Sequence, residues 1–255
     1  MKVAAVQFSP QFKAPEQNIA LALDLVSKAA QGGAKLIVLP ELCTSGYSFM
    51  STDEARPFAE ILTQDPGVLK RMADEKRPNS VGAMREAAMQ FGAAIAWGLV
   101  EEDPGTGDLY NSQMLVLPTG EWISYRKVNQ WANDYLWSVA GTGSPPIRKF
   151  MGKDIGLLVC ADVRDKSDSI DSFYESGDAN IVAFSSNWGK GGFPAGKWVK
   201  FAKANHCTLV ASNRYGQEQN NDFGNGGICI IEPSGKVHCK GLVWDQPCMV
   251  FAEVP

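Results

Sequence analysis

The chain has 255 residues, 45% of them hydrophobic and 20% charged, so it is long enough to bury a sizeable core. Its 24 Lys and Arg against 28 Asp and Glu give a formal net charge of -4, without a basic run, which excludes nucleic acid as an expected partner. It contains no uninterrupted apolar segment of about 18 residues, and the apolar opening MKVAAVQF is too short for a signal-peptide core. We therefore expect neither a membrane span nor export.

The cysteines and histidines argue against a metal site. Six cysteines stand at positions 43, 160, 207, 229, 239 and 248 without a C-x-x-C pair, and the only histidines are His206 and His238. That spacing does not fit a zinc site, so we expect no metal and no other cofactor. A chain of this size without a secretory signal does not need disulfides, which favours reduced thiols and a cytoplasmic location.

The first half of the chain alternates strand and helix patterns. Ile19, Leu23 and Val26 fall at helical spacing, and the run KLIVLP is short, continuous and rich in branched residues, as in a strand covered on both faces. The predicted elements are a strand at 2–8, a helix at 15–30, a strand at 35–40, a helical region near 66–91, hairpin strands at 93–99 and 112–118, and a further strand at 121–127.

The second half repeats this alternation. We predict a strand at 155–160, a polar helical stretch, a strand at 180–186, a helix near 195–206, a strand at 207–213, a hairpin within 226–237 and a last strand at 249–254. No linker or low-complexity tract interrupts the pattern. The sequence therefore predicts a single α/β domain over 1–255 with largely buried sheets.

Three chemically capable residues stand at the ends of apolar strand candidates. Glu41 follows KLIVLP, Lys127 follows WISYR, and Cys160 closes IGLLVC. Ligands gather at the carboxyl ends of strands in α/β sheets, so these three side chains can converge. Each signal alone is weak, because such a glutamate is more often a helix cap, such a lysine a surface residue, and such a cysteine a small buried hydrophobe.

The residues around these three positions make the pattern more specific. The segments LPELCTSGY (39–47), YRKVN (125–129) and VCADVR (159–164) resemble, in order and rough spacing, the three signature blocks of the nitrilase superfamily of carbon-nitrogen hydrolases. Similarity extends to the strand ending in Gln7, to Tyr110-Asn111, and to the segments at 185–189, 212–216 and 226–235. The resemblance implies an αββα sandwich that usually forms a homodimer or larger homo-oligomer, and a catalytic set of Glu41, Lys127 and Cys160.

The chemistry of these groups agrees with that assignment. A free thiol is mostly protonated at neutral pH, so a nucleophilic Cys160 needs a base, and Glu41 can accept its proton. The oxyanion that forms when Cys160 attacks a carbonyl carbon can be met by the Lys127 ammonium and by the backbone N–H of Ala161. Loss of ammonia leaves a thioester, which water activated by Glu41 hydrolyses. Asn187 and Trp188 are further candidates for contact with the substrate.

Several neighbouring positions are open. The family often places a second glutamate seven or eight residues after the lysine, where this sequence has Asp134 and Tyr135, so Asp134 is the candidate substitute. We expect Glu101 to be a solvent-facing turn carboxylate and Cys43 to be buried packing. Asp162 and Arg164 are expected to form ion pairs that fix the Cys160 loop.

Other catalytic and binding motifs are weaker. His206 is expected inside a helix and His238 in a polar hairpin, so neither indicates a Cys/His dyad. A near match to a phosphate loop at 191–197 continues with Trp198 where a Ser or Thr is required, which argues against nucleotide binding.

The interpretation is an amidase acting on a small amide substrate. N-carbamoyl amidohydrolase, nitrilase and a non-catalytic binding protein on the same fold are the alternatives. The block CADVR lacks the Trp-Glu that usually follows the cysteine in true nitrilases, and the Glu41 loop runs to Ser-Gly-Tyr as in amidase-like branches, which favours the amidase. The sequence does not identify the substrate.

Overall fold

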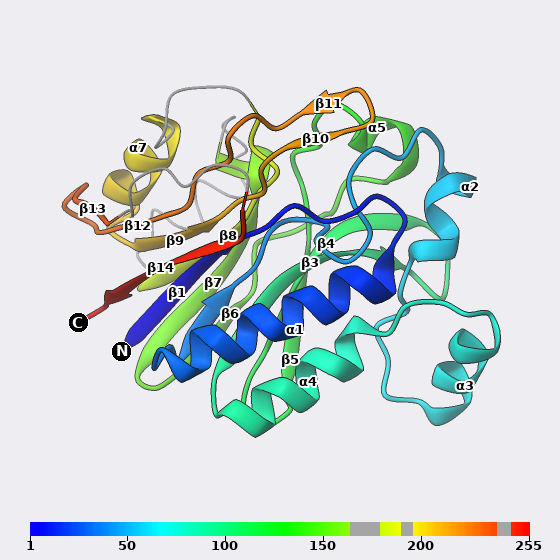
Figure 1. Ribbon diagram of the computed structural model, residues 1–255, viewed down its shortest axis with the longest axis horizontal. Helices are drawn as coiled ribbons and strands as arrows, with labels where there is room; N and C mark the ends of the chain where they lie inside the picture. Colours follow the sequence, from blue (N-terminus) through cyan, green and yellow to red (C-terminus); the bar gives the residue numbers. More distant parts are fainter. Residues whose placement is uncertain (164–178, 190–195, 239–245) are drawn as a thin grey trace.

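The computed structural model describes residues 1–163, 179–189, 196–238 and 246–255, which form two six-stranded sheets with helices outside them (Figure 1). The first sheet, in the order β14-β1-β2-β3-β4-β5, contains β1 (Lys2–Gln7), β2 (Leu36–Val38), β3 (Ala94–Glu102), β4 (Leu109–Val116), β5 (Trp122–Arg126) and β14 (Cys248–Glu253). The second, in the order β13-β12-β9-β8-β7-β6, contains β6 (Ile147–Phe150), β7 (Lys153–Val159), β8 (Ile181–Ser185), β9 (Thr208–Ser212), β12 (Cys229–Ile231) and β13 (Val237–His238).

The remaining elements are helices, 3-10 turns and one small ribbon. The helices are α1 (Pro15–Gln31), α2 (Thr52–Ala55), α3 (Pro66–Asp74), α4 (Ser80–Phe91), α5 (Asp134–Trp137) and α7 (Gly196–Ala204). The 3-10 turns are η1 (Arg56–Phe58) and η2 (Cys160–Val163), and the ribbon pairs β10 (Gln217–Glu218) with β11 (Asn221–Asp222).

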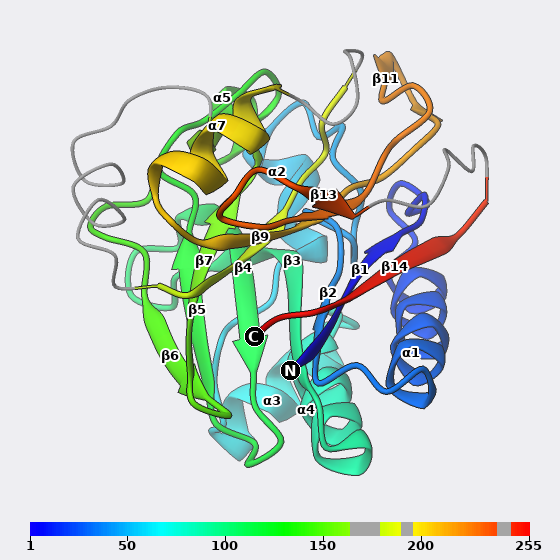
Figure 2. The ribbon, with the colours of Figure 1, turned by 90° about the vertical axis from the view of Figure 1, so that its left-hand side faces the viewer.

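Alternation along the strands explains the layers. In β1, Val3 and Ala5 belong to the core between the two sheets, whereas Ala4 and Val6 belong to the core under α1 and α4. Both faces of the strand are therefore apolar, as expected for a sheet covered on both sides. Helix α7 packs Trp198 against the second sheet, so α1 and α4 lie on one side of the molecule and α7 on the other (Figure 2). The predicted αββα sandwich is confirmed.

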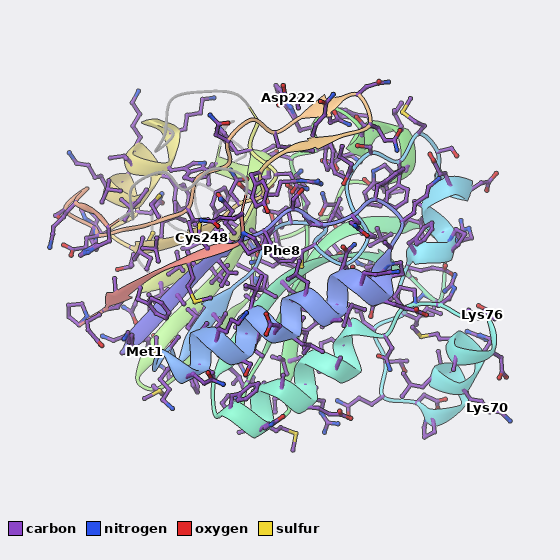
Figure 3. All side chains as sticks on the ribbon, viewed as in Figure 1. Met1, Phe8, Lys70, Lys76, Asp222 and Cys248 are labelled. Atoms are coloured by element: carbon purple, nitrogen blue, oxygen red, sulfur yellow. The ribbon has the colours of Figure 1, made fainter. Side chains whose placement is uncertain are left out.

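Side-chain placement follows the same division. Phe8, just after β1, is fully buried and lies in the interior of the molecule (Figure 3). Lys70 and Lys76, in and after α3, are exposed at the periphery. None of the helices in the described ranges is both long enough and apolar enough to cross a membrane.

The structure corrects some predicted boundaries. The helical region near 66–91 is two helices, because the chain turns at Lys76, which has a φ of 56°, and Asn79 then caps α4 by accepting from the N–H of Gly82. His206 lies in a turn beyond α7, where its φ is 49°, so its predicted place inside the helix is wrong. The polar helical stretch after Cys160, Arg164 and most of the phosphate-loop match fall outside the described residues.

Candidate active site

The three predicted catalytic residues follow three strands, two in the first sheet and one in the second. Strand β2 is parallel to β3, and β5 runs in the same direction because β4 is antiparallel to both β3 and β5. Glu41 follows β2 and Lys127 follows β5, so both leave the same edge of the sheet. Cys160 begins η2 directly after β7 rather than ending the strand.

The carboxylate of Glu41 is fully buried and accepts three hydrogen bonds. Its Oε1 accepts from Lys127 Nζ at 2.7 Å and from Asn111 Nδ2 at 2.7 Å, while its Oε2 accepts from the backbone N–H of Asn187 at 2.7 Å. A carboxylate oxygen has about two lone-pair sites. Oε1 is thus saturated, and Oε2 retains the free site at which a proton can be received.

Asp134 is the second carboxylate of the group. Its Oδ2 accepts from Lys127 Nζ at 2.6 Å and from the backbone N–H of Trp131 at 3.0 Å, and its Oδ1 accepts from Asn111 Nδ2 at 3.1 Å. Tyr135 is 68% exposed, which places Asp134 and not Tyr135 beside the lysine.

Lys127 is a buried cation between two carboxylates. Burial lowers the pKa of its ammonium, but the charges of Asp134 and Glu41 more than offset this, so that the pKa lies well above its ordinary value. The ammonium therefore stays charged through the neutral range. It can supply a fixed positive charge without taking part in proton transfer.

Cys160 lies next to this group and is only 5% exposed. Burial raises the pKa of its thiol above the ordinary value, and the negative charge of Glu41 adds to the rise, while the Lys127 ammonium and the backbone N–H of Asn187 oppose it. The resting thiol is therefore protonated, and its attack requires a base. Its φ of 43° marks a sharp turn after the strand, at which Ala161 follows as the next buried residue.

Asp162 fixes the Cys160 loop through backbone groups. Its Oδ1 accepts from the N–H of Asn129 at 2.9 Å, and its Oδ2 accepts from the N–H of Val159 at 3.0 Å. Burial raises the pKa of this carboxyl to about 6. The expected fixing of the loop is present, but through these amides; the expected partner Arg164 is outside the described residues.

Gly98 of β3 explains how the Glu41 loop lies so close to the sheet. A Cβ on this glycine would stand 2.7 Å from Glu41 Cα, a distance that real contacts essentially never show. The N–H of Gly98 also donates to the carbonyl of Pro40 at 3.2 Å. The backbone around Glu41 thus requires glycine at this position.

We predict that Gly98→Ala displaces the Glu41 backbone and lowers the rate of turnover at least about 10-fold, with a stability loss of about 1–3 kcal/mol from overpacking. Gly196→Ala is the matched control, because none of the described atoms lies within 4 Å of its added Cβ. Steady-state kinetics and thermal unfolding of both variants check the prediction. Equal activity in the two variants would contradict it.

Asn187 and Trp188 follow β8 but differ in their contacts. The backbone of Asn187 is part of the Glu41 site, as described above. The Trp188 ring packs edge-on against Trp198 of α7 with 5.4 Å between centroids, and its backbone N–H donates to Asn213 Oδ1 at 2.8 Å. The described contacts of Trp188 are therefore those of a packing residue.

Glu101 and Cys43 lie apart from the site. Glu101 is buried in β3 and bonded to Ser112 Oγ at 2.6 Å and to Arg126 Nε at 2.8 Å, so its expected solvent-facing position is wrong. The strand carries it inward and a cation from β5 compensates its charge. Cys43 is buried in the core under α1 and α4, as expected.

Two contributions were missed by the sequence analysis. Asn111, noted only within a similar segment, donates to both Glu41 and Asp134 and so couples the two carboxylates. The available signal was a run of polar residues, Asn111 to Gln113, within the otherwise apolar strand β4. Tyr47 was noted only as part of Ser-Gly-Tyr, yet its hydroxyl donates to the carbonyl of Trp131 at 2.7 Å and ties the Glu41 loop to the Asp134 loop.

Glu218 holds this Tyr47 loop in place. Its Oε1 accepts from the N–H groups of Tyr47 and Ser48 at 2.7 and 2.8 Å, and its Oε2 accepts from Arg214 Nη1 at 2.6 Å. Both charged groups are buried. The pair connects the ribbon β10-β11 to the loop that leaves Glu41.

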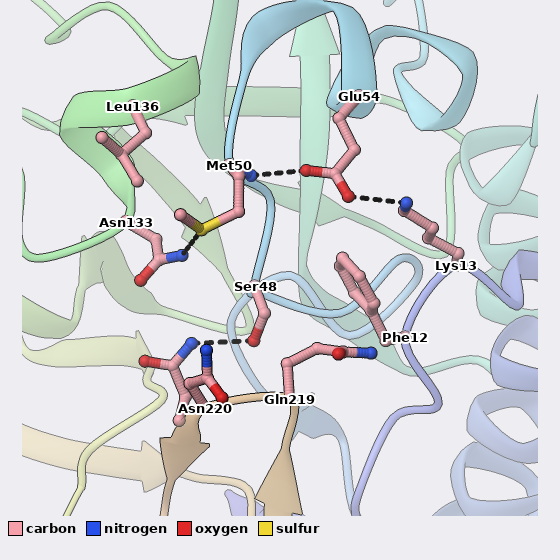
Figure 4. Close-up of a pocket in the computed structure, with 10 residues that line it drawn as sticks. Phe12, Lys13, Ser48, Met50, Glu54, Asn133, Leu136, Gln219 and Asn220 are labelled. Atoms are coloured by element: carbon pink, nitrogen blue, oxygen red, sulfur yellow. Dashed lines mark hydrogen bonds and ion pairs between the residues drawn. The ribbon is translucent and has the colours of Figure 1, made fainter.

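A cavity of about 440 Å³ opens over these loops (Figure 4). Its lining includes Ser48 and Asn133, the chain neighbours of Tyr47 and Asp134. Figure 4 also shows the ion pair between Lys13 Nζ and Glu54 Oε1, 2.6 Å long, at the cavity. The remaining lining residues are Phe12, Met50, Leu136, Gln219, Asn220 and Asn221.

Comparison with known proteins identifies the family of this chain. The family model described as carbon-nitrogen hydrolase matches residues 2–255. The 2-oxoglutaramate amidase of Bacillus subtilis is 28% identical over 94% of this chain and 85% of the relative. A nitrilase of Pyrococcus abyssi is 29% identical over 64% of this chain, which matches only 56% of that relative's length.

The fold recurs in solved structures. An amidase of the nitrilase superfamily from Nesterenkonia AN1 superposes with a TM-score of 0.81 at 23% identity, covering 100% of this chain and 90% of that one. The family model covers almost the whole chain, and the predicted resemblance is confirmed. The chain therefore belongs to the carbon-nitrogen hydrolase family, a family of hydrolases that act on carbon–nitrogen bonds other than peptide bonds.

Proposed function

We propose that residues 1–255 form one catalytic domain, an amidase that converts a small amide to a carboxylic acid and ammonia through a thioester on Cys160. The observation that carries the proposal is the buried Glu41 carboxylate, bonded to Lys127 at 2.7 Å and to the Asn187 N–H that also reaches the Cys160 thiol. A nucleophile, a base and a fixed cation together serve covalent catalysis, and a binding protein has no use for all three.

Acylation begins with a protonated thiol. Cys160 Sγ attacks the carbonyl carbon while Glu41 Oε2, the oxygen with a free acceptor site, takes the thiol proton. The carbonyl oxygen becomes an oxyanion, which the Lys127 ammonium and the N–H of Ala161 stabilise. Glu41 then gives its proton to the substrate nitrogen and the C–N bond breaks. Ammonia departs, and the acyl group remains on Cys160 as a thioester.

Deacylation uses the same groups in reverse order. Glu41 takes a proton from water, whose oxygen attacks the thioester carbon, and Lys127 again faces the oxyanion. The C–S bond breaks and the Cys160 sulfur recovers the proton from Glu41. Asp134 and Asn111 touch no reacting atom in this scheme, and we assign them the positioning of Lys127 and Glu41.

Two comparisons support amide hydrolysis. The full-length relative from Bacillus subtilis is an amidase for 2-oxoglutaramate. A mutant of the Nesterenkonia amidase carries the acetamide moiety of fluoroacetamide covalently bound at its active site cysteine. We propose that Cys160 is the corresponding point of covalent attachment in this chain.

The test is an ammonia-release screen over short aliphatic amides, ω-amides including 2-oxoglutaramate, N-carbamoyl amino acids and nitriles. We expect ammonia release from at least one primary amide. None of the preferred substrates should release carbon dioxide together with ammonia. Release from N-carbamoyl compounds alone, or from nitriles alone, would replace the amidase with one of the alternatives. No release from any substrate would favour a binding protein.

We predict that Glu41→Gln slows both steps by roughly 100-fold or more, because the variant neither accepts the thiol proton nor activates water. If deacylation suffers more than acylation, the thioester accumulates. Intact-mass measurement after incubation with an amide would then show a mass increase equal to the acyl group. Glu101→Gln is the control, since Glu101 is equally buried but bonded to Ser112 and Arg126. Similar rates for the two variants would contradict the role of Glu41.

The homodimer implied by the family resemblance stays a prediction. Sedimentation at micromolar concentration tests it, and a monomer would contradict it.

A further inference from the structure

The side chain of Asn187 is buried without a hydrogen bond. The residue is 7% exposed, and within the described chain neither its Oδ1 nor its Nδ2 has a partner. An unsatisfied buried donor or acceptor costs about 1–3 kcal/mol, so most such groups in proteins are paired. Asn111 differs in that only its Oδ1 lacks a described partner, because its Nδ2 donates to two carboxylates.

The position of Asn187 suggests what satisfies its side chain. Its backbone N–H donates to Glu41 Oε2 at 2.7 Å and also acts on the Cys160 thiol. The Cα of Asn187 is therefore one bond from an atom that touches both proton-exchanging groups. The carboxamide carbon is three bonds from that nitrogen, so covalent geometry keeps the carboxamide close to both groups.

We propose that Asn187 recognises the scissile primary amide, with Oδ1 accepting from the substrate N–H and Nδ2 donating to the substrate carbonyl oxygen. This inference rests on the proposed amidase function and names the side chain that binds the substrate amide group. A primary amide presents one donor and one acceptor side by side, which is the complement of an Asn carboxamide. Binding thus pairs both orphaned atoms at once.

The proposal has a consequence for specificity. An ester and a nitrile have no N–H, so either would leave Asn187 Oδ1 unpaired in the complex. A site built to bond an N–H rejects analogues that lack it, because its buried polar atom loses its partner. Asn187 is accordingly the residue that sets the preference for amides over esters and nitriles of the same acyl group.

The test compares butyramide with methyl butyrate, which yield the same thioester on Cys160. For Asn187→Leu, we expect kcat/KM for the amide to fall roughly 10- to 100-fold and kcat/KM for the ester to change less than about threefold. Butyronitrile, assayed in parallel, should behave like the ester. Asn187→Ala removes the same two atoms without adding a branched side chain and should give the same change in the amide-to-ester ratio.

The matched control is Asn205→Leu. Asn205 is also 7% exposed, but its Nδ2 donates to the carbonyl of Phe201 at 2.9 Å, after α7. This variant should lose stability and keep the wild-type amide-to-ester ratio.

Each other outcome overturns the proposal. Equal losses for amide and ester in the Asn187 variants would show a structural role, as would failure of both variants to fold. An unchanged ratio with normal rates would show that the side chain does not contact the amide. If the Asn187 variants contradict the proposal but the wild-type enzyme hydrolyses amides, the proposed amidase function is still supported. If the wild-type enzyme hydrolyses no primary amide, both the amidase function and the role of Asn187 are wrong.

Discussion

Cys160→Ala is expected to lower amide turnover at least about 1,000-fold, because the variant lacks the sulfur atom on which the thioester forms. The neighbouring charges remain in place in this variant, since Glu41 keeps Lys127, Asn111 and the Asn187 N–H as donors. Substrate affinity should therefore change much less than turnover. Alanine and cysteine are equally strained at the φ of 43° found at this position, so the substitution adds no backbone strain. The fold should therefore survive, and the free energy of unfolding should fall only by the contribution of one buried sulfur atom.

The measurement is kcat with intact-mass analysis of the protein after incubation with the amide. No acyl adduct should form on Cys160→Ala. Cys207→Ala is the control, because Cys207 is also a buried free thiol with a pKa raised to about 12, but that rise comes from burial and not from Glu41. A Cys160→Ala enzyme with more than about one per cent of wild-type activity would remove Cys160 as the nucleophile.

Lys127→Met is expected to lower turnover by roughly 100-fold or more, the scale of losing one oxyanion donor. The oxyanion exists only transiently, so KM should change less than kcat. The variant also leaves Glu41 and Asp134 as two buried carboxylates without their cation. Breaking a buried ion pair in this way costs about 3–5 kcal/mol, so we expect a marked fall in thermal stability as well.

The pH dependence separates the electrostatic role of Lys127 from a packing role. The pKa of Cys160 is raised by burial and by Glu41, and the Lys127 ammonium lowers it. Alkylation of wild-type Cys160 by iodoacetamide should therefore increase only at a pH above that of an ordinary thiol, and Lys127→Met should move the increase to still higher pH. An unshifted profile with normal turnover would show that Lys127 is a bystander.

The pKa of Lys127 itself sets a second boundary. Because this pKa lies well above its ordinary value of 10.5 in the folded protein, the stabilising contribution of the ammonium is complete below pH 10.5 and is lost as the pH rises through the folded-state pKa. Wild-type stability should thus be independent of Lys127 titration through the neutral range.

Lys149→Met is the control for Lys127→Met. Lys149 pairs with Asp154 at 2.9 Å but is 71% exposed, so the turnover and the stability of this variant should stay close to wild type.

The fold class and the three candidate catalytic residues could be predicted from the amino-acid pattern alone. Periodicity placed β1, α1, β2 and β7 close to their observed bounds, because an apolar pattern is local information. Glu41 and Lys127 follow strands of one direction in the first sheet, so their meeting could be predicted from strand ends without coordinates. Cys160 follows β7 of the second sheet, so its place beside them depends on how the two sheets pack.

The second carboxylate beside Lys127 and the unpaired side chains depend on contacts between distant segments, which the sequence does not reveal. Asp134, Tyr135 and Glu101 are alike in the sequence as polar residues near the blocks, yet Asp134 faces Lys127, Tyr135 faces outward and Glu101 bonds to Arg126. The direction of a side chain in a short helix or an inward-facing strand depends on how neighbouring segments pack. Asn111 and Asn187 both donate to Glu41, from which they are separated by 70 and 146 positions in the sequence. No local pattern carries information about contacts between such distant residues.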